Sequence, residues 1–263
     1  MRNNIILPIL IVLTGISSSG CKDSFLDRVP ENSYVADNFY ASDEALEAAT
    51  APLYNRAWFD YNSRASMYLG STRANDMYSP WGYPEFTTFH VAALDEHLAN
   101  AWKSFYSVIT MANQVIADIK TKCTAEVSEG AKTQAIAEAR LMRACAYFYM
   151  VRTWGPVIII EDNQKMVDNP VLPLNREEDV FQFIINALLN ASENLPETGS
   201  QPGRATRWAA EGMLAKVYLA RPGWKKGGQR DEGDLELARQ YAADVCDNSG
   251  LELLPNYEDL FKY

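Results

Sequence analysis

Apolar side chains recur every three or four residues along two long segments of this chain. In residues 95–120 they are Leu98, Trp102, Phe105, Ile109, Ala112, Ile116 and Ile119, and in residues 131–153 they are Ala135, Ala139, Met142, Ala146, Tyr149 and Met150. This spacing places them on one stripe of an α-helix. Lys103, Asn113 and Asp118 are expected on the polar face of the first helix. The pattern predicts two long amphipathic helices, the second ended by Gly155 and Pro156.

Shorter segments with cap and stop signals predict further helices. Ser42 is a plain N-cap for a helix that Pro52 interrupts, with a second helical piece expected over 53–59. Asn175 and Glu178 form an Asn variant of the capping box for a helix that stops before Pro196. Residues 157–160 are a short β-branched run, and 162–173 are predicted to be loop.

The last two predicted helices carry small residues that allow close contact. Thr206 is expected to cap residues 207–221, and residues 235–247 are closed by Gly250. The small residues are Ala209, Gly212, Ala215, Ala238 and Ala242. This pair resembles a degenerate tetratricopeptide unit, although no regular period of about 34 residues runs through the chain. The fold class expected from all these segments is all-α, built of antiparallel helix pairs.

Residues 62–92 are the least helical part of the pattern and are rich in Gly, Pro and Asn. A loop of this length within a compact domain usually has a function. Its candidate binding residues are Arg73, Asn75, Asp76, Trp81 and Tyr83. Aromatic rings stack on the C–H faces of sugars, and Arg, Asn and Asp bond to their hydroxyls. The alternative is that Trp81 and Tyr83 pack the loop onto the helices.

The first thirty residues have the layout of a secretory signal that ends at a cysteine. Arg2 gives a positive start, residues 5–16 are apolar, and Ser18-Ser19-Gly20 precede Cys21. The apolar run is too short to span a bilayer comfortably. The segment resembles a bacterial lipoprotein signal with Cys21 acylated, although Ser18 stands where Leu is usual. We therefore expect a signal peptide over 1–20, an extended leader over 21–41 and a helical domain over 42–263.

Composition excludes several functional classes. The 263 residues carry a formal net charge of −10, which argues against nucleic acid and anionic lipid headgroups as ligands. Besides Cys21, the cysteines are three in number and widely spaced, so they are expected to be small core residues. No nucleophile elbow, phosphate loop or zinc motif occurs, and no cofactor is expected. The two histidines, His90 and His97, are not expected to bind metal.

Several segments taken together resemble the SusD/RagB family of outer-membrane nutrient-binding lipoproteins. They are Cys21 with Phe25-Leu26-Asp27 and Pro30; Trp102, Tyr106, Ile109, Ala112 and Asn113; Glu138 to Ala144 with Tyr147-Phe148 and Gly155-Pro156; Arg204-Ala205-Thr206 with Ala209, Ala215 and Tyr218-Leu219; and Leu253, Pro255-Asn256-Tyr257 and Leu260-Phe261. Most of these residues are expected to have structural roles. Glu138, Arg140 and Arg143 are expected to form an ion-paired helix face.

The resemblance implies a cell-surface lipoprotein that captures oligosaccharide and passes it to a SusC-like TonB-dependent transporter in the outer membrane. Family members are about twice this length, so the C-terminal part of the family fold, which supplies many ligand contacts, is expected to be missing. Two alternatives remain. One is an extracellular helical-repeat scaffold that binds peptide or protein. The other, less favoured, is a glycoside hydrolase with Asp76 and Glu85 as its carboxylates.

Overall fold

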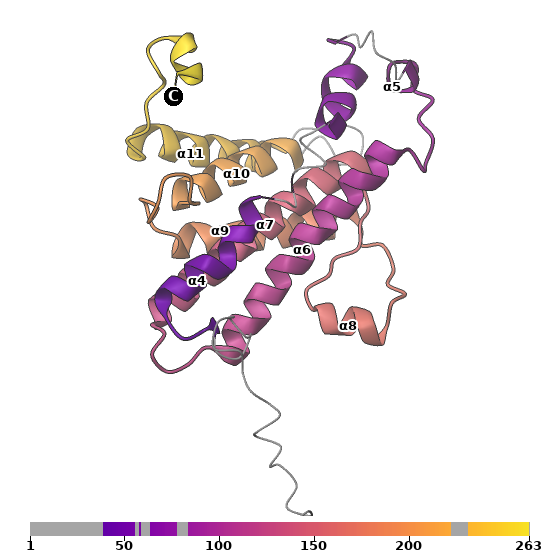
Figure 1. Cartoon of the computed structure of the whole chain (residues 1–263). Helices are drawn as coiled ribbons and strands as arrows, with labels where there is room; N and C mark the ends of the chain where they lie inside the picture. Colours follow the sequence, from indigo (N-terminus) through magenta and orange to yellow (C-terminus); the bar gives the residue numbers. More distant parts are fainter. Residues whose placement is uncertain (1–38, 56–57, 59–63, 78–83, 222–230, 263) are drawn as a thin grey trace, which may run out of the picture. The chain divides into compact units, whose positions relative to one another are not determined.

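The computed structural model (Figure 1) describes residues 39–55, 58, 64–77, 84–221 and 231–262, and all of its regular elements in these ranges are helical. The α-helices are α4 (Asp43–Thr50), α5 (Pro84–Thr88), α6 (Glu96–Lys122), α7 (Glu129–Trp154), α8 (Asn163–Asp168), α9 (Glu177–Asn194), α10 (Arg207–Ala220) and α11 (Glu232–Asn248). The shorter helical turns are η1 (Ala51–Tyr54), η4 (Tyr68–Thr72) and η7 (Tyr257–Phe261). The expected all-α fold class is confirmed.

Helices α6 and α7 pack against one another and match the two long periodic segments. Asp95 caps α6, its carboxylate accepting the backbone N–H groups of His97 and Leu98 at 2.9 and 3.1 Å. α7 ends at Gly155, whose φ of +73° suits a residue without a Cβ atom. The successive helices α6, α7, α9, α10 and α11 each pack on the next, and α4 packs on α7 (Figure 1). Helix pairs therefore build this part of the chain, as expected.

The core fills the space between these helices with large side chains. Its fully buried members include Phe105 and Ile109 of α6, Tyr147 and Met150 of α7, Phe181, Ile184 and Leu188 of α9, and Leu214 of α10. The predicted stripes supply most of the α6 and α7 residues in this set. No helix in the described ranges is both long enough and apolar enough to cross a bilayer.

The expectation that Asn113 lies on a polar face is wrong, because this side chain is buried. Its amide donates to the carbonyl oxygen of Ile160 at 2.8 Å, and its oxygen accepts from Nη1 of Arg143 at 2.6 Å. Burying an amide is tolerated when its hydrogen bonds are made. Burial lowers the pKa of the Arg143 guanidinium. Asn113 thus ties the segment after α7 to α6.

The expected ion-paired face of Glu138, Arg140 and Arg143 is also wrong. Glu138 is buried and pairs with Arg204, which lies before α10, at 3.0 Å. Arg143 points into the core and contacts Asn113 and the ring of Phe183. These charges are therefore buried in separate polar networks of the tertiary structure and do not stabilise α7 as a surface pair.

Two local predictions around residue 170 fail for identifiable reasons. Residues 163–168, expected in a loop, form α8, because the carboxylate of Asp162 caps it by accepting the N–H of Gln164. Asn175 does not cap α9, which begins after Arg176. The Asn175 side chain instead accepts the N–H of Ile159 at 2.8 Å, and its backbone bridges Val157. A tertiary contact has replaced the local cap.

The final helix pair lies within three residues of its predicted bounds. Thr206 stands at the N-cap of α10 but makes no side-chain cap bond, and the preceding loop is tied down by Arg204. α11 begins at Glu232, ahead of the predicted start at Leu235, because the carboxylate of Asp231 caps it by accepting the N–H of Asp234 at 3.1 Å. Arg221 forms a bidentate ion pair with Asp234, which joins the two helices.

Residues 62–92 contain more helix than expected. Residues 64–74 are continuously helical, with η4 at their centre, and α5 follows. Ala65, Tyr68 and Thr72 are buried at helical spacing, a signal that the Gly and Asn content masked. Helix α4 ends just before Pro52, as predicted, with Leu53 buried in η1. Of the helical piece expected over 53–59, only its first residues are in η1, and residues 56, 57 and 59 lie outside the described residues. The expected signal peptide and acylated Cys21, most of the leader, and Trp81 and Tyr83 lie outside the described residues.

Candidate functional site

Arg73, Asn75 and Asp76 lie together where the helical stretch 64–74 ends. Arg73 follows η4 directly, and Asn75 ends the helix with a φ of +61°, a conformation that Asn tolerates. The backbone N–H groups of Asn75 and Asp76 donate to the carbonyl oxygens of Thr72 and Ser71. Arg73 is half-buried, whereas Asn75 and Asp76 are exposed. Three of the five predicted binding residues thus lie at this helix end, but only Arg73 lines a cavity.

Arg73 opens onto a cavity of about 420 Å³, here called the aromatic cavity. It is lined by Leu69, Gly70, Arg73, Phe86, Val91, Leu98, Tyr149, Arg152, Thr153 and Trp154. These residues come from η4 and the residue after it, α5, the segment between α5 and α6, the start of α6 and the end of α7. The volume lies within the usual range for small-molecule sites. Segments far apart in sequence thus meet around one hollow.

Ring contacts fix the walls of the aromatic cavity. Phe86 is fully buried and stacks on Tyr68, with ring centroids 5.2 Å apart. On the other wall, Trp154 meets Trp102 edge to face at 5.2 Å, and Tyr149 stacks on Phe105 at 5.8 Å. Such pairs add to the stabilisation given by burial alone. The cavity is therefore bounded by rings that are held in place before any ligand arrives.

Two guanidinium groups provide the polar chemistry of the aromatic cavity. The Arg73 guanidinium lies 4.5 Å from the centre of the Phe89 ring, and that of Arg152 lies 5.1 Å from the centre of the Phe148 ring. Neither makes an ion pair with a carboxylate in the described ranges, and no described Asp or Glu lines the cavity. Their N–H groups remain available to hydroxyl or carbonyl oxygens of a ligand.

Sequence reasoning missed the contribution of α7 to this site. Tyr149 belongs to the apolar stripe of residues 131–153, and neither Arg152 nor Trp154 is among the binding residues that the sequence predicts. The available signal was Trp154 beside Gly155, which places a large ring at a helix end. Their meeting with Arg73 depends on how α7 packs against residues 64–98, and no local pattern specifies that.

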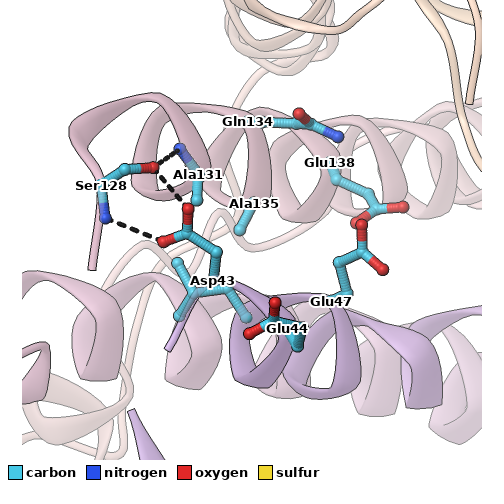
Figure 2. Close-up of a pocket in the computed structure, with 9 residues that line it drawn as sticks. Asp43, Glu44, Glu47, Ser128, Ala131, Gln134, Ala135 and Glu138 are labelled. Carbon is cyan, nitrogen blue, oxygen red and sulfur yellow. Dashed lines mark hydrogen bonds between the residues drawn. The ribbon is translucent and has the colours of Figure 1, made fainter. Parts of the chain in front are cut away.

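A second hollow, here called the acidic pocket, lies between α4 and α7 and measures about 300 Å³. It is lined by Asp43, Glu44, Leu46, Glu47, Ser128, Ala131, Gln134, Ala135 and Glu138. Figure 2 shows the carboxylates of Glu47 and Glu138 turned toward one another from facing helices. No aromatic ring is among the described lining residues, so this pocket lacks a surface on which a sugar ring stacks.

Bonds within the protein occupy two of the acidic groups in this pocket. Asp43 accepts the backbone N–H and the hydroxyl of Ser128, both at 2.8 Å (Figure 2). These bonds, the backbone one first, lower the pKa of the Asp43 carboxyl. Glu138 accepts from Arg204 and from the Tyr54 hydroxyl, and Arg204 also donates to Thr50 Oγ1 at 2.8 Å. Burial, reinforced by the bond to Glu138, raises the pKa of Tyr54.

The described residues contain no group of three or more His, Cys, Asp and Glu side chains placed to hold a metal ion. His90 Nδ1 lies 2.8 Å from the carbonyl oxygen of Thr88, and the His97 ring packs against Tyr68 in the first turn of α6. The two histidine side chains therefore make separate local contacts, His90 after α5 and His97 in α6.

Comparison with known proteins gives consistent matches. The sequence model of the SusD-like family described as "Starch-binding associating with outer membrane" matches residues 24–219. A SusD-like protein of Bacteroides ovatus is 71% identical over 255 residues, which is 97% of this chain and 46% of that protein. SusD-like protein P25 of Formosa agariphila is 23% identical over 98% of this chain and 48% of its own length. The chain thus spans about half the length of the curated relatives it matches.

Solved structures also match this chain over a little less than half of their own length. A crystal structure with xylogluco-oligosaccharide has a TM-score of 0.77 and 74% identity, covering 83% of this chain and 43% of that one. A SusD homolog from Bacteroides thetaiotaomicron has a TM-score of 0.70 at 24% identity, over 89% of this chain and 45% of that one. The second match speaks for the fold alone.

Proposed function

The chain belongs to the SusD-like family, and on that premise we propose that it captures oligosaccharide at the cell surface without cleaving it. We further propose that it passes this ligand to a SusC-like TonB-dependent transporter. The transporter and the direction of transfer follow from the family resemblance. The ligand class has separate support from one comparison and from the chemistry of the aromatic cavity.

The observation that carries the proposal is the match to a structure with xylogluco-oligosaccharide. That protein is 74% identical to this chain over 83% of this chain's residues, a match that covers 43% of that protein. At this identity most side chains of the shared part are the same, so a ligand surface in that part would be largely retained. We therefore take xylogluco-oligosaccharide as the first ligand to test.

The chemistry of the aromatic cavity supports a sugar ligand. Sugar rings present apolar C–H faces together with hydroxyl groups, and the cavity combines ring walls with the donors of Arg73 and Arg152. Asn75 and Asp76 are exposed polar residues that closely follow Arg73 in sequence, although neither lines the cavity. We propose that Trp81 and Tyr83, which follow Asp76 in sequence, complete the binding surface.

The absence of carboxylates from the described lining of this cavity supports binding without hydrolysis. Glycosidases place two carboxyl groups about 5 to 9.5 Å apart on either side of the scissile bond. Asp76 is an exposed residue beyond the end of a helix, and Glu85 lies in the first turn of the short helix α5. Neither residue lines the aromatic cavity. A hydrolytic role for this pair has no support from their surroundings.

Membrane attachment is proposed to occur through an acylated Cys21. The apolar run that ends in Ser18-Ser19-Gly20 before this cysteine is the supporting observation. Each acyl methylene buried in the bilayer contributes about 0.8 kcal/mol, so two or more chains on one residue give stable anchoring. The outer membrane, with the domain facing the exterior, is the location we propose.

Titration calorimetry of the wild-type chain with xylogluco-oligosaccharide tests the binding proposal. Stacking on one ring is worth on the order of 1 kcal/mol, so Trp81→Ala should weaken binding about fivefold and leave the melting temperature nearly unchanged. Trp102 is the control, because its ring packs against Trp154 and Tyr106. Trp102→Ala should destabilise the fold by about 3 to 5 kcal/mol.

Three results would count against this proposal. Absence of oligosaccharide binding together with retention of peptides would favour the helical-repeat scaffold. Release of shortened sugars would show an enzyme. Unfolding of Trp81→Ala without a separate effect on ligand would show that this ring belongs to the core.

The anchor has its own test in cells. Cys21→Ala should move the protein from the outer-membrane fraction to the soluble fraction and abolish palmitate labelling. If the variant stays in the membrane fraction and is still labelled, Cys21 is not the site of acylation.

A further inference from the structure

Phe89 combines two properties that rarely occur together in one aromatic residue. Its side chain is 62% exposed, and its backbone φ is +63°. A bulky residue in this left-handed region is strained, because its Cβ atom crowds the following carbonyl oxygen. Burial normally offsets such strain, but most of this ring lies in solvent. Phe89 therefore costs the fold stability without an equal return from core packing.

The position of Phe89 is one where glycine is the ordinary residue. It follows α5 directly, and the N–H of His90 donates to the carbonyl oxygen of Glu85 at 2.9 Å. This bond is the long hydrogen bond of a Schellman motif, whose left-handed residue is usually Gly. Helix α5 would thus end in the same way, and with less strain, if residue 89 had no side chain.

The ring of Phe89 does not itself line the aromatic cavity, but it contacts Arg73, which does. The guanidinium of Arg73 lies 4.5 Å from the ring centre, and Arg73 itself lines the cavity. Two neighbours of Phe89 in sequence, Phe86 and Val91, line it as well. The contact with Arg73 holds the ring in one orientation, while the exposed part of the ring is open to a ligand.

We infer that Phe89, backed by Arg73, is a stacking platform for a sugar ring at the edge of the aromatic cavity. This inference rests on the proposed oligosaccharide function and adds a binding residue to it. Strained residues collect at functional sites, where a side chain has to be presented in a fixed direction. The apolar C–H face of a pyranose would lie on the exposed part of the ring, with the Arg73 donors near its hydroxyl groups.

Phe89→Gly gives a test in which stability and binding move in opposite directions. Removing the strain should raise the melting temperature by about 2 to 4 °C. Removing the ring should weaken binding of xylogluco-oligosaccharide about threefold to tenfold in titration calorimetry with the full chain. A variant that is more stable but binds less well cannot owe its weaker binding to unfolding.

Two further variants complete the design. Phe89→Tyr keeps a ring and should bind within about twofold of the wild type, whereas Phe89→Asn tolerates the left-handed backbone but has no ring and should match Phe89→Gly in binding. Unchanged affinity in Phe89→Gly, or a lower melting temperature, would contradict the role of Phe89 as a stacking platform but would leave the proposed oligosaccharide function standing. Failure of the wild-type chain to bind any oligosaccharide would overturn the proposed function and this inference with it.

Discussion

The aromatic cavity and the acidic pocket differ most in how their charged groups are satisfied. In the acidic pocket, Glu138 is bonded to Arg204 and Tyr54, and Asp43 is bonded to Ser128. In the aromatic cavity, Arg73 and Arg152 contact ring faces but make no ion pair with a described carboxylate. The protein's own groups thus bond to Glu138 and Asp43, whereas Arg73 and Arg152 retain hydrogen-bond donors for a ligand.

This difference indicates which hollow is structural and which is suited to binding. A bonded, buried charge stabilises a fold only while its partner is present. A guanidinium held by a ring keeps most of its hydrogen-bonding capacity. We therefore expect substitutions at the acidic pocket to change stability, and substitutions at the aromatic cavity to change affinity.

The largest effect should come from Arg204→Ala, which leaves the buried carboxylate of Glu138 without its cation. Breaking such a pair costs about 3 to 5 kcal/mol of unfolding free energy, and the side chains of Arg204 and Glu138 are only 13% and 8% exposed. Urea unfolding measures this loss. The control is Arg239→Ala, whose exposed pair with Glu236 should contribute no more than about 1 kcal/mol. Equal, small losses in the two variants would remove the structural role assigned to the acidic pocket.

The next effect, on affinity, should come from Arg152→Gln. The side chain is exposed at the end of α7, so the unfolding free energy should change by no more than about 0.5 kcal/mol. Loss of its donors should weaken oligosaccharide binding about threefold to tenfold, as calorimetry would measure. Arg140→Gln is a matched control, because Arg140 lies on the same helix but does not line the cavity. If both variants bind as the wild type does, Arg152 has no role in recognition.

The long helices were predictable because their cause is local. Their apolar spacing repeats within one or two helical turns, and α6 and α7 begin and end within about two residues of the predicted bounds. The predicted cap of Ser42 on α4 is equally local. The exceptions have distant causes. Asn113 was expected at the surface but bonds to Ile160, and Asn175 was expected to cap α9 but bonds to Ile159. Both polar groups meet the same segment after α7.

The site was predictable only in part for the same reason. Arg73, Asn75 and Asp76 were found because they share one segment of unusual composition. Arg152 and Trp154 line the same cavity as Arg73 only through the packing of α7, which lies much later in the chain. The sequence Thr88-Phe89-His90 carries no sign that Phe89 has a left-handed backbone, because that conformation is usually signalled by Gly.

The smallest predicted effect is on how stability depends on pH, and it distinguishes the acidic pocket from the aromatic cavity. The bonds from Ser128 lower the pKa of Asp43 in the folded chain below its ordinary value of 3.8. The ionised form is therefore favoured by folding, and this contribution is present above about pH 4 and is lost as the pH falls through the lowered pKa. Asp43→Asn should remove that part of the pH dependence, so its urea midpoint should fall less than that of the wild type between about pH 5 and about pH 3.

Glu44→Gln serves as the control for this measurement, because Glu44 lines the same pocket but makes no hydrogen bond with a described residue. Its urea midpoint should follow the wild-type curve over the whole range. Oligosaccharide affinity at neutral pH should be the same in both variants, since neither carboxylate lines the aromatic cavity. A loss of affinity in Asp43→Asn would mean that the acidic pocket also takes part in recognition, and the division between the two hollows would then be wrong.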